Sequence, residues 1–160
     1  MRTRVGAGIL AGLIAGVVFG IMMTMMTAPT PDGGRMPMMA MVAQVVGSNS
    51  LVVGWVYHLF NSAVIGAIFG WFLGRGGLGY GGTLAKGVGY GILWWILGAQ
   101  ILMPLFLGME PFAALRMAPM RPVAMMSLVG HVIYGGILGL VYAGLRRAEP
   151  EGRVEPVTQR

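Results

Sequence analysis

The sequence contains no cysteine, which excludes disulfide bonds, thiolate metal sites and a cysteine nucleophile. Charged residues are also scarce, at 10% of the 160 residues, whereas 56% are hydrophobic. A soluble domain of this length needs more charge than that to cover its surface. The two deficits together indicate a protein whose surface meets lipid over most of its area.

Motifs for catalysis and for nucleic-acid binding are missing as well. The sequence contains no G-x-S-x-G elbow, no P-loop and no H-E-x-x-H motif. The net charge of +6 comes from basic residues at the ends of apolar runs, not from a basic patch interleaved with aromatics. We therefore predict a protein that is not an enzyme, has no catalytic residues and does not bind nucleic acid.

What the chain does contain is four long apolar segments, residues 5–27, 51–73, 87–107 and 123–145, none with Asp, Glu, Lys or Arg. A helix needs about 20 apolar residues to cross a bilayer. We predict an all-α integral membrane four-helix bundle in residues 1–146 and a cytoplasmic tail in residues 147–160. A further apolar stretch, Met38 to Gly47, is too short to span, and it predicts a short interfacial helix after the first span.

The basic residues are distributed unevenly between the two sides of these spans. Three of the eleven, Arg35, Arg116 and Arg121, lie on one side, and the other eight lie on the opposite side. Because cytoplasmic loops carry the excess of Lys and Arg, the richer side is predicted to be cytoplasmic. This pattern predicts a multi-pass protein of the cell membrane, with the lipid bilayer as its partner and both termini in the cytoplasm.

The second and fourth spans resemble each other in sequence. Residues 58–70 read HLFNSAVIGAIFG, and residues 131–143 read HVIYGGILGLVYA, so that His58 aligns with His131 and Gly66 with Gly139. The first and third spans share a weaker likeness between Gly6-Ala-Gly and Gly87-Val-Gly. We interpret the chain as an internal repeat of two tandem helical hairpins in the same orientation.

Small residues recur every four positions along three of the spans and form a glycine zipper. Helices in lipid associate by close backbone approach, which small residues permit. The same grooves could join copies of the chain in a homo-oligomer or attach it to a larger membrane complex. The predicted packing residues are Gly8, Gly12, Gly16, Gly20, Ser62, Gly66, Gly70, Gly135 and Gly139.

Four polar side chains fall in the outer halves of the predicted spans: His58, His131, Asn61 and Gln100. A polar group inside the membrane is costly unless it is paired. We predict that the four form one polar cluster. Its simplest interpretation is a hydrogen-bond network that fixes the register of the helices.

A copper site is the second interpretation. Apart from Met1, all of the 15 methionines lie toward the predicted outer side. Thioethers select Cu(I), and imidazole also binds copper. Met22-x-x-x-Met26 resembles the Met-x-x-x-Met of eukaryotic high-affinity copper transporters, which also contain Gly-x-x-x-Gly. The candidate copper ligands are Met22, Met26, Met125 and Met126, together with the histidines.

A haem b site is the third interpretation, with His58 and His131 as the two axial ligands of one iron. The second and fourth spans are predicted to run parallel, and the two histidines lie at similar depths along them. Glycines near the histidines would leave space for the macrocycle. The sequence leaves these three interpretations open.

The fourth span also carries a family resemblance. Its pattern His131-x-x-Tyr134-Gly135-x-x-x-Gly139-x-x-Tyr142 resembles that of small four-helix membrane proteins of bacteria and archaea, grouped as a domain of unknown function. The resemblance implies the four-helix fold and no reaction. The function we expect is a structural or accessory role in the membrane, with copper handling and haem b binding as alternatives.

Overall fold

The computed structural model describes residues 3–30, 32–74 and 79–147, and within them most of the chain is helical. Four helical segments are long and apolar enough to cross a membrane, which confirms the predicted all-α four-helix architecture. The first is α1 (Arg4–Met25), and the second is α3 (Leu51–Ile68) with the π-helical segment η1 (Phe69–Leu73). The third comprises α4 (Tyr80–Trp94), the π-helical η2 (Trp95–Leu102) and α5 (Met103–Phe106). The fourth is α7 (Arg121–Arg147), preceded by the 3₁₀ turn η3 (Ala118–Met120).

The third helix begins earlier than predicted, at Tyr80 instead of Gly87, and therefore includes Lys86. The prediction started the helix just after the charged Lys86. A lysine side chain is long enough, however, for its ammonium group to reach a polar partner. The Lys86 Nζ donates to the Leu73 carbonyl at 3.1 Å, at the end of the second span. The predicted tail lies outside the described residues, except for Arg147 at the end of α7.

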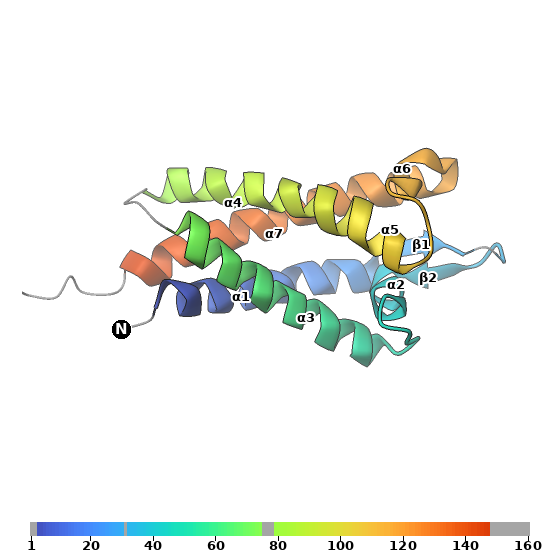
Figure 1. The fold of residues 1–160 in the computed structure, drawn as a ribbon, viewed down its shortest axis with the longest axis horizontal. Helices are drawn as coiled ribbons and strands as arrows, with labels where there is room; N and C mark the ends of the chain where they lie inside the picture. Colours follow the sequence, from blue (N-terminus) through green and yellow to red (C-terminus); the bar gives the residue numbers. More distant parts are fainter. Residues whose placement is uncertain (1–2, 31, 75–78, 148–160) are drawn as a thin grey trace, which may run out of the picture.

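The short elements gather at one end of the bundle, which we call the methionine end (Figure 1). They are the antiparallel strands β1 (Thr27–Pro29) and β2 (Arg35–Pro37), the helix α2 (Met38–Gln44) and the single turn α6 (Ala113–Arg116). The helix α2 is the short helix predicted within Met38 to Gly47. The two strands were not predicted, because three residues are too few to show an alternating pattern.

Small residues bring α1 and α3 into backbone contact. A Cβ on Gly12 would collide with the Ser62 carbonyl oxygen, and one on Gly66 would collide with the Gly8 carbonyl oxygen. Gly16 lies against the Ser62 side chain, Gly20 against Trp55, and Gly70 against the Arg4 carbonyl. The predicted packing residues of the first hairpin thus all lie in one seam.

The second hairpin, α4 with α7, repeats this contact pattern. Gly87 lies against the Gly135 carbonyl, as Gly12 lies against the Ser62 carbonyl, and Gly139 lies against the Thr83 carbonyl. By these contacts Gly12 and Gly87 occupy equivalent positions in the two hairpins, whereas the sequence comparison aligned Gly6 with Gly87. That comparison was wrong by more than one turn, because the recurring glycines allow several alignments.

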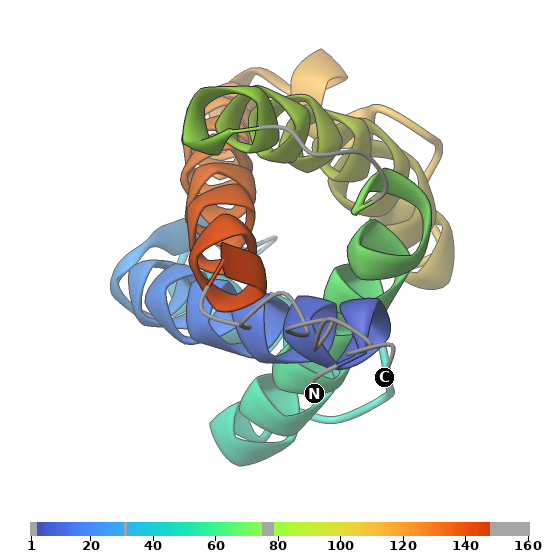
Figure 2. The same ribbon diagram turned by 90° about the vertical axis from the view of Figure 1, so that its left-hand side faces the viewer.

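The two hairpins meet in a different way. Viewed along the bundle, α1 lies between α3 and α7, and α4 lies on the far side of α7 (Figure 2). Between the second and third spans, the Tyr90 hydroxyl donates to the Ile65 carbonyl at 2.9 Å. The Tyr134 hydroxyl of α7 donates to the Ser62 carbonyl at 3.2 Å. Long aromatic side chains thus bridge the hairpins, and toward the methionine end the space between them opens into two cavities.

Candidate metal-binding cavities

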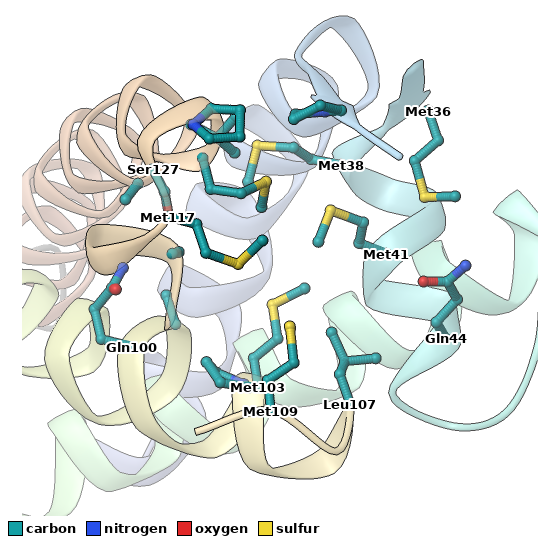
Figure 3. A pocket seen from close by; sticks show the side chains of 18 of the residues that line it. Met36, Met38, Met41, Gln44, Gln100, Met103, Leu107, Met109, Met117 and Ser127 are labelled. Carbon is teal, nitrogen blue, oxygen red and sulfur yellow. The ribbon is translucent and has the colours of Figure 1, made fainter. Parts of the chain in front are cut away.

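The larger cavity lies at the methionine end and has a volume of about 550 Å³. Seven methionines and no charged residue among the described parts of the chain line it, so this wall is made largely of thioethers and aliphatic groups. In Figure 3 several of these side chains project toward one another across the central space, with Met36 nearer the edge. We call this space the methionine cavity, and its methionines are Met36, Met38, Met41, Met103, Met109, Met117 and Met120.

Both halves of the chain build this cavity. Met36, Met38 and Met41 come from β2 and α2. Met103 comes from α5 at the end of the third span, and the remaining three methionines follow it before α7. Pro104 has no N–H to donate to the carbonyl of Gln100, four residues earlier. The N–H of Phe112 donates to that carbonyl instead, at 2.6 Å. Phe112 adopts a left-handed φ of 62°, and the loop turns back over the end of the third helix.

Two amide side chains, Gln44 and Gln100, lie in the wall of this thioether-rich space. Gln100 is 1% exposed, and its Oε1 has no hydrogen-bond partner among the described residues. A buried acceptor without a partner costs about 1–3 kcal/mol.

A second, smaller space of about 240 Å³ lies deeper in the bundle, and we call it the histidine chamber. His58 from α3 and His131 from α7 both line it, together with Asn61, Met23 and Phe19. The Phe19 ring contacts both imidazoles edge-on, with centroid distances of 5.7 Å to His58 and 4.8 Å to His131. The two histidines thus share one interior space, as their similar depths predict.

Each imidazole is held by a backbone carbonyl. The His58 Nε2 lies 2.8 Å from the carbonyl oxygen of Gly16 on α1. The His131 Nδ1 lies 2.8 Å from the carbonyl oxygen of Ser127, one turn earlier on α7. Because a carbonyl oxygen can only accept, these two nitrogens carry the protons of the neutral rings.

The four predicted cluster residues do not form one hydrogen-bonded group. His58, His131 and Asn61 line the histidine chamber, whereas Gln100 lines the methionine cavity. Both histidines bond to backbone carbonyls, and the His131 Nδ1 also lies 3.4 Å from the Ser127 hydroxyl. The prediction grouped these residues by depth alone, and the direction of each side chain around its helix separates Gln100 from the others.

The four methionines singled out from the sequence lie elsewhere. None of them lines either cavity. Met125 and Met126 are 52% and 48% exposed. Met22 and Met26 pack as partly buried side chains against the apolar core. Spacing along one helix selected these residues, whereas the cavity depends on how the loops fold back over the helix ends.

The methionines that do line the cavity carry a signal in the sequence. They belong to the set confined to one side of the four spans, at the ends of the helices and in the loops between them. That clustering was visible, but no helical periodicity shows which of its members converge.

The residues present do not fit a haem between the two histidines. The Phe19 ring packs against both imidazoles. The chamber of about 240 Å³ is also smaller than the roughly 300–1,000 Å³ that small-molecule pockets usually have.

The side chains that line the methionine cavity belong to the donor class that soft metal ions take. No group of three His, Asp or Glu side chains that could hold a harder ion gathers within residues 3–30, 32–74 and 79–147. Thioether sulfur is the donor most abundant around the cavity, and among biological metals it favours Cu(I).

Comparison with known proteins gives no further guide, since no family model, curated protein or solved structure matches the chain. The four-helix family resemblance stays a prediction from the sequence.

Proposed function

We propose that this protein is a small accessory membrane protein that binds Cu(I) in the methionine cavity. The observation that carries the proposal is the convergence of seven methionines from both halves of the chain on one space of about 550 Å³. Methionine also serves as adaptable apolar packing. Packing alone would fill the space, whereas here the thioethers surround an open volume.

The composition of the wall favours a monovalent soft ion. A divalent ion such as Zn²⁺ or Ca²⁺ takes carboxylate, imidazole or thiolate ligands, and no charged side chain lines the cavity. A Cu(I) ion needs less charge compensation, and neutral thioethers suit it. The positive-inside rule predicts that the methionine end faces the outside of the membrane, where the ion would arrive.

The test is anaerobic titration of the detergent-purified full chain with Cu(I), in competition with a chromophoric Cu(I) chelator. We expect binding with sulfur ligands in the X-ray absorption spectrum. The triple variant Met103→Leu, Met109→Leu and Met117→Leu keeps the side-chain volume close to that of the wild type. It should weaken Cu(I) binding by roughly tenfold or more, since each tenfold corresponds to about 1.4 kcal/mol.

A matched control comes from methionines outside the cavity. The double variant Met125→Leu and Met126→Leu removes two exposed thioethers from the same face of the membrane and should bind Cu(I) as the wild type does. Equal losses in the control and in the cavity variant would mean that binding is nonspecific. A wild-type protein that takes up no Cu(I) would refute the proposal and leave a purely structural role.

A further inference from the structure

The methionine cavity and the histidine chamber adjoin each other. Four residues line both spaces, and two of them, Met38 and Met103, are methionines. The chamber adds a third methionine, Met23, from the end of α1. An ion held in the outer cavity therefore has thioether neighbours that also face the deeper space.

Each of the two histidines in the chamber has one ring nitrogen held by a hydrogen bond and one left free. The His58 Nε2 and the His131 Nδ1 each donate their single proton to a backbone carbonyl, as described above. This leaves a lone pair on the His58 Nδ1 and on the His131 Nε2. Metal-binding histidines in proteins usually show this arrangement, in which the second ring nitrogen donates to a carbonyl or carboxylate and fixes the tautomer.

Both lone pairs remain open to the chamber. Within the described part of the chain, the enclosed side-chain nitrogens and oxygens that lack a partner are the Trp94 Nε1 and the Gln100 Oε1. The free imidazole nitrogens are not among these enclosed atoms, and the structure shows no hydrogen bond to either of them. They are therefore unbonded and accessible from the chamber that both rings line.

We propose that the histidine chamber is a second Cu(I) site, which takes the ion from the methionine cavity. The ligands are the His131 Nε2 and the His58 Nδ1, with Met38 and Met103 as the thioethers shared by the two sites. This inference rests on the proposed function, because the outer cavity supplies the ion. Transfer proceeds by exchange of neutral ligands around one ion, and no change of oxidation state is involved.

The decisive measurement is ¹⁵N NMR of the full chain labelled at histidine, with Cu(I) added anaerobically in steps. Cu(I) is diamagnetic, so coordination appears as a shift of the unprotonated nitrogen of each ring. We expect the resonances of the His58 Nδ1 and the His131 Nε2 to shift, while the two protonated nitrogens keep their protons. Unshifted histidine resonances at saturating Cu(I) would overturn the inference, whatever the variants do.

Variants locate the second ion. His131→Gln should lower the Cu(I) stoichiometry from two to one and remove the nitrogen contribution from the X-ray absorption spectrum. Tyr57→Phe, in the wall of the same chamber, is the matched control and should keep both ions. Full stoichiometry and an unchanged nitrogen contribution in a folded His131→Gln variant would contradict the assignment.

The two proposals fail in different ways. Sulfur-only coordination in the wild type, with silent histidines, overturns the second site and leaves the methionine site in place. Uptake of a single ion with both nitrogen and sulfur ligands, unchanged by Met109→Leu and Met117→Leu in the outer cavity, refutes the methionine cavity and retains the histidine site. No uptake of Cu(I) at all refutes both.

Discussion

The seams within the two hairpins and the cavities between the hairpins are built in opposite ways from the same four helices. In the seams, Gly12 and Gly66 of one hairpin and Gly87 and Gly139 of the other leave no room for a single methyl group. Between the hairpins, α1 packs directly on α7, whereas toward the methionine end methionine, tyrosine and tryptophan side chains surround about 550 Å³ and 240 Å³ of space. Small residues thus join the helices within each hairpin, and large side chains line open space between the hairpins.

The largest loss of stability is expected when one methyl group is added to a seam. Gly12→Ala places its Cβ against the Ser62 carbonyl oxygen, a backbone atom that cannot turn aside. We expect a loss of about 1–3 kcal/mol in the free energy of unfolding, typical of overpacking. Denaturation of the detergent-solubilised protein with SDS, followed by circular dichroism, measures it.

A glycine outside the seams provides the control. A Cβ on Gly89 of α4 would meet nothing within 4 Å, and Gly89→Ala should leave the free energy of unfolding unchanged or slightly raised. If the two alanine variants were equally stable, the seams would not be close-packed.

A smaller effect is expected where the hairpins meet. Tyr90→Phe removes the hydrogen bond to the Ile65 carbonyl and leaves the ring in place. Interhelical hydrogen bonds in membranes contribute about 0.6–2 kcal/mol, so the variant should lose stability within that range. The same SDS denaturation applies, and a loss as large as that of Gly12→Ala would show that the hairpins depend on the bridging side chains as much as on the glycines.

The smallest effect on stability should come from the cavity wall. Gln100→Leu removes a buried amide oxygen that has no partner among the described residues. Because that atom is desolvated without compensation, its removal should leave the free energy of unfolding unchanged or raise it by up to about 1 kcal/mol. Ser127→Ala, in the same wall, serves as a comparison. A clear loss in Gln100→Leu would indicate that the amide has a structural partner in the protein.

The sequence alone located the four membrane spans, but it did not identify the residues that line the two cavities. Length and apolar character located four helices, because in lipid a helix satisfies its own backbone groups and little else can cross. The predicted start of the third span was wrong because Lys86 lies within the helix. Its hydrogen bond to the Leu73 carbonyl is a tertiary contact that the sequence does not reveal. The converging methionines could not be chosen from helical spacing, because the loops fold back over the helix ends through tertiary contacts such as the bond from Phe112 to Gln100. The shared depth of His58 and His131 was predictable, but the carbonyls that fix their tautomers were not.

The division of the methionine cavity between the two halves of the chain has a mechanical consequence. Met36, Met38 and Met41 belong to the first hairpin and its extension, and Met103, Met109, Met117 and Met120 belong to the second. An ion held by sulfurs from both sets would link the two hairpins. Binding of the ion and association of the hairpins would then favour each other by mass action. Binding of the ion would strengthen the interface between the two hairpins, and its release would weaken that interface. A neighbouring protein that contacts both hairpins could therefore distinguish the metal-bound form from the metal-free form.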